Sequence, residues 1–215
     1  GEWLNALPIS SCGLRMGNDV IRAAVAFRIG NRLCEPHPCR CGSLVDAFGT
    51  HGLSCNKSAA AGRQLRHHLL NDIIWRALSR ANIPSTKEPL GLHRTDAKRP
   101  DGVTLTARQA GKCLLWDATS PDTQAASHLN GTSKKAGAAA EQAANLKIEK
   151  YRELIPKYLF VPIAVETLGP INEEGANFLC DLGSRIEKIT QDRLEKCHIF
   201  QRISVAVQRG NALSF

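Results

Sequence analysis

Residues 99–119 read RPDGVTLTARQAGKCLLWDAT. Two runs with strand character, 101–106 and 112–118, flank the segment 107–111, whose composition is typical of a turn. The stretch therefore predicts two neighbouring antiparallel strands joined by a short connection. Polar residues that can carry chemistry lie at both ends of this hairpin.

Asp101 opens the first run and Asp117 closes the second. If the turn is centred near Gln109, the two aspartates lie opposite each other, on one face and about 5 Å apart at Cβ. Two carboxylates this close repel each other unless a divalent cation lies between them. Mg²⁺ binds through one or two carboxylates together with water and substrate phosphate, and activates water for attack on a phosphodiester. The alternative is a pair of solvated turn aspartates without a catalytic role.

Around the hairpin, the hydrophobic period switches between helix and strand. The order predicts a mixed α+β fold, an α/β layer in which a small central mixed sheet is flanked by helices. The expected helices lie at about 18–29, 63–81, 133–155, from Asn172 to about 190, and 192–209, and further strands at 86–92 and 158–167.

Apolar side chains recur at helical spacing in these segments. They are Ile21, Val25 and Ile29 in the first helix and Leu179, Leu182, Ile186 and Ile189 in the helix after Asn172. Cys113, Cys180 and Cys197 fall on strand or helix patterns, so we interpret each of them as a small buried hydrophobic residue.

A second group of polar residues precedes the hairpin. Cys39 and Cys41 are followed, after nine residues, by His51 and then Cys55. Three thiolates and one imidazole complete the tetrahedron of a structural zinc site, which would clip a segment too irregular to build its own core. The neighbouring Cys34 and His37 leave open whether one of them belongs to the ligand set, and the alternative is a chance cluster of small thiols.

The expected helix 133–155 carries Lys147 and, one turn later, Tyr151. A lysine beside the acid pair would orient the attacking water and offset charge in the transition state. Lys150 competes with Lys147 for this role, and for either residue the alternative is an ordinary solvated helix lysine. The sequence does not decide whether Glu88 supplies a further acid.

The composition favours a polyanionic partner. The 215 residues carry 28 Lys and Arg against 20 Asp and Glu, a net charge of +8. Nucleic acid is the default partner of such a chain, and Arg63, Arg66, His67 and Arg99 are the expected contacts. No apolar run approaches the roughly 20 residues that a transmembrane helix needs. Because residue 1 is Gly rather than Met, we expect a piece of a longer protein.

Five features follow one another along the chain. They are the Cys/His cluster, the basic helix start at Arg63, Arg66 and His67, the Lys98-Arg99-Pro100-Asp101 motif, Asp117, and the Lys147-x-x-x-Tyr151 pattern. Together they resemble the restriction-like endonuclease domain of site-specific non-LTR retrotransposons, a branch of the PD-(D/E)xK nucleases. In the wider superfamily a lysine follows the second acid by two residues, where this chain has Thr119. The retrotransposon branch moves that lysine to the helix, as Lys147 fits.

This resemblance covers about residues 34–168 and implies a metal-dependent endonuclease that nicks target DNA to prime reverse transcription. It implies metal-binding acids at Asp101 and Asp117, a catalytic Lys147 with Tyr151 beside it, and zinc on the Cys/His cluster. The expected organisation is an N-terminal loop and helix (1–33), a zinc loop (34–62), a nuclease core (63–170) and C-terminal helices packed on it (171–215).

The resemblance also implies a context. The domain would belong to a longer polyprotein with a reverse transcriptase, contact element RNA through upstream domains and work in the nucleus. Two other classes of function fit the same residues: a zinc-stabilised nucleic-acid-binding domain with an inactive nuclease fold, and a purely structural interaction domain.

Overall fold

The computed structural model describes residues 1–55, 57, 59–92 and 99–215, and Lys98 of the basic motif lies outside them. Its main sheet has the order β3-β4-β5-β6, formed by Ser85–Lys87, Gly102–Thr104, Leu114–Thr119 and Leu159–Ala164. The first two pairings are antiparallel and β5 pairs with β6 in parallel. The expectation of a mixed α+β fold with a small mixed sheet flanked by helices is confirmed.

The hairpin register is the one that the sequence predicts. Gly102 pairs with Trp116 and Val103 with Leu115, so the turn is centred at position 109 and the next position brings Asp101 opposite Asp117. Asp101 lies one residue before β4. Its side-chain Oδ2 atom accepts a hydrogen bond from the backbone amide of Ala118 at 2.6 Å, in place of a backbone carbonyl of the ladder.

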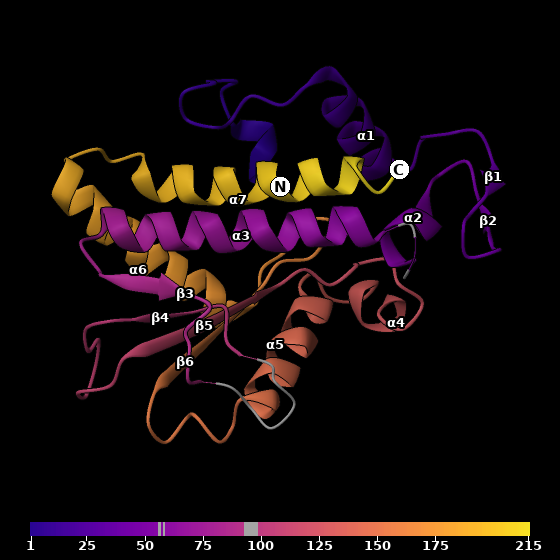
Figure 1. Ribbon diagram of the computed structural model, residues 1–215. Coiled ribbons are helices and arrows are strands. Elements are labelled where there is room, and N and C mark those ends of the chain that lie inside the picture. The colour runs from indigo at the N-terminus through magenta and orange to yellow at the C-terminus, as the bar shows by residue number, and fades with distance from the viewer. Residues whose placement is uncertain (56, 58, 93–98) are drawn as a thin grey trace.

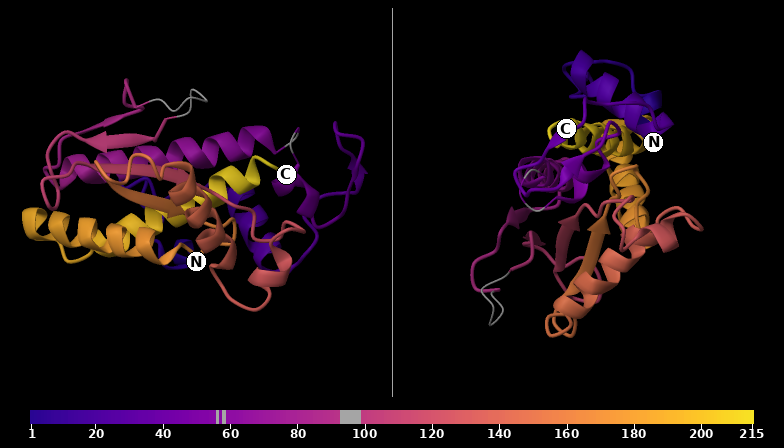
Figure 2. Two further views of the ribbon diagram at one scale, coloured as in Figure 1. Left: turned by 90° about the horizontal axis from the view of Figure 1, so that it is seen from below. Right: turned by 90° about the vertical axis from the view of Figure 1, so that its right-hand side faces the viewer.

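Helices cover both faces of the sheet (Figure 1). Two long helices, α3 and α7, lie side by side along one face together with α6, and α5 lies against the other face, as the end-on view in Figure 2 also shows. The helices are α1 (Asn18–Ile29), α3 (Ala60–Arg80), α5 (Ala138–Lys150), α6 (Glu173–Thr190) and α7 (Glu195–Ala212), with short α2 (Thr50–Ser54), α4 (Leu129–Thr132) and a 3₁₀ turn, η1 (Glu2–Asn5).

One hydrophobic core joins α3, the sheet, α6 and α7. From β5 it receives Leu114, Trp116 and Ala118, whereas the alternate residue Leu115 packs toward Tyr151 on the α5 side. Asp117 follows the same alternation, so its side chain is directed toward α5. Among the described residues, no helix is both long and apolar enough to cross a bilayer.

Some apolar positions lie on the solvent side. Ile21, Val25 and Ile29 of α1 are 40%, 40% and 67% exposed. The buried side of α1 instead carries two alanines and Phe27, because small residues let the helix approach its neighbour closely, and Phe27 contacts the ring of Phe215. The predicted burial is also wrong for two other residues. Ile189 is exposed in the last turn of α6, and Cys197 is exposed on α7. Cys113 and Cys180 are half-buried.

The segment between α1 and α3 is more regular than its composition suggests. A two-stranded hairpin, β1 (His37–Pro38) with β2 (Leu44–Val45), leads into α2. Its small core contains Cys39, Val45, Cys55 and Ala59, separate from the main core.

Candidate functional site

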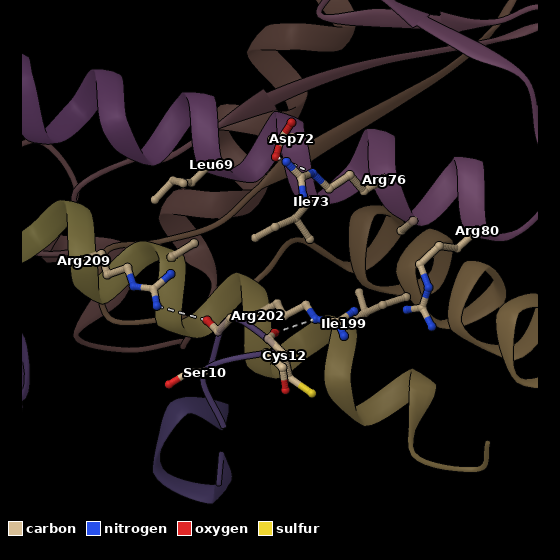
Figure 3. Close-up of a pocket in the computed structure, with 14 residues that line it drawn as sticks. Ser10, Cys12, Leu69, Asp72, Ile73, Arg76, Arg80, Ile199, Arg202 and Arg209 are labelled. Atoms are coloured by element: carbon tan, nitrogen blue, oxygen red, sulfur yellow. Dashed lines mark hydrogen bonds and ion pairs between the residues drawn. The ribbon is translucent and has the colours of Figure 1, made fainter. Parts of the chain in front are cut away.

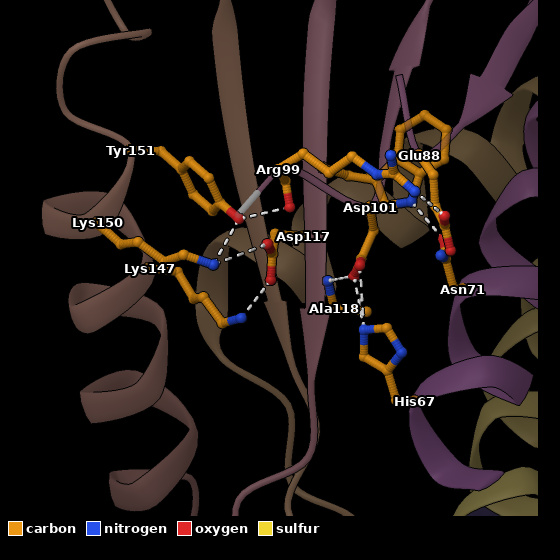
Figure 4. A network of polar contacts seen from close by, with 11 residues as sticks. His67, Asn71, Glu88, Arg99, Asp101, Asp117, Ala118, Lys147, Lys150 and Tyr151 are labelled. Carbon is orange, nitrogen blue, oxygen red and sulfur yellow. Dashed lines mark hydrogen bonds and ion pairs between the residues drawn. The ribbon is translucent and has the colours of Figure 1, made fainter. Parts of the chain in front are cut away.

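Asp117 is the buried carboxylate of the site, with 2% of its surface exposed. Lys147 forms an ion pair with Oδ1, and the Nζ atom of Lys150 lies 3.9 Å from Oδ2 (Figure 4). Burial, followed by the nearby charge of Asp101, raises the pKa of Asp117, while Lys147 acts in the opposite direction. Nearby positive charge favours the ionised form of a buried acid.

Both candidate lysines reach the acid because they occupy one face of the last turn of α5. Lys150 follows Lys147 by three positions, so their side chains lie next to each other. Beyond the helix end, the Tyr151 hydroxyl accepts a hydrogen bond from Lys150 at 2.6 Å and donates one to the Arg99 carbonyl at 2.8 Å. Tyr151 therefore joins the lysine turn to the segment that enters β4.

Asp101 is held from the other side of the sheet, by α3. The Nε2 atom of His67 lies 3.1 Å from both carboxylate oxygens, and this hydrogen bond raises the pKa of His67. The two acids are thus opposite in register as predicted, but they do not share one face: Asp101 turns toward α3 and Asp117 toward α5 (Figure 4). The reason is that Asp101 has left the strand and caps its end.

His67 is consequently a partner of Asp101 in this structure rather than a freely projecting phosphate contact. Sequence reasoning placed it among the basic residues and missed this role, because the contact depends on how α3 packs on the sheet. No spacing rule links residue 67 to residue 101.

Arg99 forms an ion pair with Glu88, while the Glu88 amide donates to the Asp101 carbonyl at 2.7 Å. The Glu88 carboxylate is 59% exposed and is directed at Arg99. Glu88 is therefore a backbone neighbour of the acid pair, and its carboxylate is engaged elsewhere.

Arg66 corrects one expectation. Its side chain is 1% exposed and donates to Asn211 Oδ1 at 3.2 Å and to Ser214 Oγ at 3.4 Å, and burial lowers its pKa to about 10. Arg66 is thus an interior residue between α3 and α7 and is not placed to contact a phosphate. Its spacing of four residues from the buried Leu70 is the sequence signal that places it on the inner face of α3.

Arg63, by contrast, is exposed. One of its guanidinium nitrogens donates to the Cys55 carbonyl at 3.1 Å. It therefore links the start of α3 to the Cys/His segment while remaining accessible to a partner.

The four predicted cysteine and histidine ligands meet in space. Their ligand atoms all lie within 4.8 Å of one another, with 3.6 Å between the Cys39 and Cys55 sulfurs and 3.2 Å from Cys41 Sγ to His51 Nε2. Zinc bond lengths of about 2.0 Å to nitrogen and 2.3 Å to sulfur imply tetrahedral edges of roughly 3.5–3.8 Å. The donor set and its spacing are therefore compatible with zinc.

Local backbone conformations create this cluster. Cys39 and Cys41 lie in the turn between β1 and β2, where Gly42 has φ 95°, and Gly49, with φ 69°, precedes the α2 turn that carries His51. The two residues that the sequence left open lie outside it. The Cys34 thiol donates to the Asp46 carbonyl, and His37 Nδ1 to the Glu35 carbonyl.

No family model and no curated protein matches this chain.

Among the described residues, the Cys/His cluster is the one group of three or more Cys, His, Asp or Glu ligand atoms this close together. Within the described part of the chain, Asp101 and Asp117 do not form such a group with a third Cys, His, Asp or Glu.

Glu166 is a further residue that sequence reasoning missed. It is fully buried just after β6, and Oε1 accepts the Ala139 and Ala140 amides at 3.0 and 3.1 Å. A carboxylate in this place satisfies unpaired amides and complements the dipole at a helix start. Glu166 therefore fixes the beginning of the helix that carries both lysines.

Proposed function

We propose that the chain is a metal-dependent DNA endonuclease domain of the PD-(D/E)xK type. The proposal rests on the position of two elements, the β4–β5 hairpin and helix α5, whose polar side chains meet at the end of the hairpin. The register pairs Asp101 with Asp117, and α5 directs Lys147 and Lys150 at Asp117. Acids and lysines in this combination are suited to the hydrolysis of a phosphodiester.

The residues divide the work as follows. Asp101 and Asp117 would hold a divalent cation, whose charge, when bound, lowers the pKa of water and offsets charge on the phosphate. His67 and the Ala118 amide hold the Asp101 carboxylate on the α3 side of the sheet, so cation binding would require this carboxylate to turn toward Asp117. Lys147 and Lys150 place positive charge beside the position where the scissile phosphate would lie, and Tyr151 positions Lys150 through its hydroxyl.

The zinc cluster has a structural role in this proposal. It would hold the segment 34–59 against the start of α3, where Arg63 contacts the Cys55 carbonyl. Arg63 and Arg99 then remain as basic residues near the two candidate centres. The net charge of +8 supports DNA as the partner.

The biological context rests on the resemblance to restriction-like endonuclease domains of non-LTR retrotransposons. On that basis the domain would nick target DNA for reverse transcription and work in the nucleus. It would belong to a polyprotein with a reverse transcriptase, whose upstream domains would contact the element RNA.

Nicking of supercoiled plasmid in the presence and absence of Mg²⁺ tests the proposal. Magnesium should simply be omitted from the negative control, because a chelator would also remove zinc. The parent should produce open circles, and Asp101→Asn and Asp117→Asn should each abolish nicking because both carboxylates are needed to retain the cation. Asp181→Asn, which alters a 54%-exposed acid on α6, is the matched control.

Two outcomes would reject the enzyme. If both active-site variants nick as fast as the parent, the activity comes from elsewhere. If the parent binds DNA without nicking it at any divalent cation concentration, the domain is a zinc-stabilised nucleic-acid-binding module.

A further inference from the structure

A groove of about 440 Å³ lies on the surface where α3 packs against α7, and residues 10–13 bound it at one side (Figure 3). Its floor is apolar, formed by side chains such as Leu69, Ile73 and Ile199. Four arginines line it, namely Arg76 and Arg80 from α3 and Arg202 and Arg209 from α7.

Two of these guanidinium groups are fixed without being neutralised. Arg202 Nε donates to the Cys12 carbonyl at 3.2 Å, and Arg209 Nη2 donates to the carbonyls of Gly13 and Arg15 at 3.1 and 2.8 Å. In the part of the chain that the structure describes, neither forms an ion pair with a carboxylate. An arginine has five N–H donors, so each keeps donors for a ligand.

The wall formed by α3 is only partly neutralised. Arg76 pairs with Asp72 at 2.7 Å but is 72% exposed, and Lys87 also lies 3.4 Å from Asp72. Arg80 pairs with the buried Glu195. Counting both acids, the four arginines leave an excess of two positive charges along the groove.

This surface lies on the opposite side of α3 from the candidate active site. His67 and Asn71 face the sheet, where they contact Asp101 and Trp116. Residues 69, 73, 76 and 80 fall about half a turn away at 100° per residue. A strand lying in the groove therefore does not contact the acid pair through the same face of α3.

We propose that the groove binds the phosphodiester backbone of a single nucleic-acid strand. Arginine recognises phosphate through two parallel N–H groups. Helix geometry places Arg76 and Arg80 about 6 Å apart along α3 and Arg202 and Arg209 about 10.5 Å apart along α7. The walls thus present a row of charges, while the apolar floor can accommodate sugars and bases. A single strand exposes its bases to such an apolar floor, whereas a duplex keeps them stacked and paired.

Fluorescence anisotropy with labelled single-stranded DNA, single-stranded RNA and duplex DNA of equal length tests this proposal on the full chain, without added Mg²⁺. Arg76→Gln, Arg202→Gln and Arg209→Gln remove charge, and Gln retains an amide donor for the carbonyls that Arg202 and Arg209 contact. Each substitution should weaken single-strand binding by roughly tenfold, the usual effect of losing a charged hydrogen bond. It should also reduce the slope of log affinity against log salt by about 0.7.

The chain contains a matched control for Arg76. On α6, Arg185 pairs with Asp181 four residues earlier at 2.8 Å, and Asp181 also has a second cation, Arg108, at 3.8 Å. Arg185→Gln therefore repeats the local chemistry of Arg76→Gln outside the groove, and it should leave single-strand affinity unchanged. Thermal unfolding of every variant verifies that the fold is retained.

Equal affinities and salt slopes for the parent, the folded groove variants and Arg185→Gln would overturn the proposal. Loss of binding to an acidic peptide, with nucleic-acid binding intact, would assign the groove to a protein partner instead. Comparison of the DNA and RNA arms identifies the source of the strand. Since the readout is binding without Mg²⁺, the result is independent of whether Asp101→Asn and Asp117→Asn abolish nicking.

Discussion

Asp117 depends on Lys147 more than on Lys150, because Lys147 pairs directly with Oδ1 whereas Lys150 stays 3.9 Å from Oδ2. Lys147→Ala should therefore leave a buried carboxylate short of its main partner and destabilise the protein by about 1–3 kcal/mol. It should also slow nicking roughly 10²–10³-fold. Denaturant unfolding and single-turnover nicking measure the two effects.

Lys150→Ala is the natural comparison, since the two side chains are similarly exposed, 23% and 25%. Its effect on unfolding should be the smaller one. A larger loss of rate for Lys150→Ala than for Lys147→Ala would assign the catalytic role to Lys150, and the acid pair would keep its role.

At the level of single residues, the sequence was most informative about ligand type and least informative about contacts. The convergence of Cys39, Cys41, His51 and Cys55 could be predicted, because cysteine and histidine in a short segment have few other uses. The interior position of Arg66 was not predicted, because charge was given more weight than helical spacing. The contact between His67 and Asp101 joins residues 34 positions apart and depends on tertiary packing.

Among the strands, β4 is the most sensitive element, because Gly102 lies against Trp116. A Cβ atom at Gly102 would lie 2.0 Å from the Trp116 ring, which is fully buried and donates to Asn71 at 2.8 Å. Gly102→Ala should therefore cost about 1–3 kcal/mol through overpacking and displace the adjacent Asp101. Gly17→Ala, where nothing lies within 4 Å of the added atom, is the control. Unfolding curves of both variants, with nicking rates, provide the measurement, and equal curves would contradict this reading of the β4–β5 contact.

For helices and strands, the sequence predicts the type and order of the elements better than the direction in which their side chains face. The turn at position 109 followed from two strands whose lengths and polar ends match, which is why the acid pair could be placed. The orientation of α1 was not predictable from its large apolar residues, because its contact uses alanines and Phe27. The direction of the Asp101 side chain depends on where β4 begins. The start of the strand is set by side-chain contacts such as the hydrogen bond from the Ala118 amide to Asp101.

For the molecule as a whole, the Cys/His segment between α1 and α3 and the main core form separate hydrophobic clusters. Removing zinc should therefore unfold the segment 34–59 while the sheet and its helices persist. Metal analysis should find about one zinc per chain, and Cys41→Ser should lose it. Hydrogen exchange should then show lost protection confined to this segment.

Cys34→Ser is the matched control, because the Cys34 thiol is bonded to the Asp46 carbonyl outside the ligand set. It should retain the metal. Zinc retained by Cys41→Ser and lost by Cys34→Ser would replace Cys41 with Cys34 among the ligands.

The pairing of α3 with α7 has a consequence for how the chain folds. Arg66 donates a hydrogen bond to Asn211, which lies 145 residues further along the chain. Strand β5 pairs with β6, and all of α5 lies between these two strands in the sequence. Contacts between such distant residues are slow to form, because the intervening loop must close first. During synthesis, the side of α3 that packs against α7 therefore stays uncovered until α7 has left the ribosome.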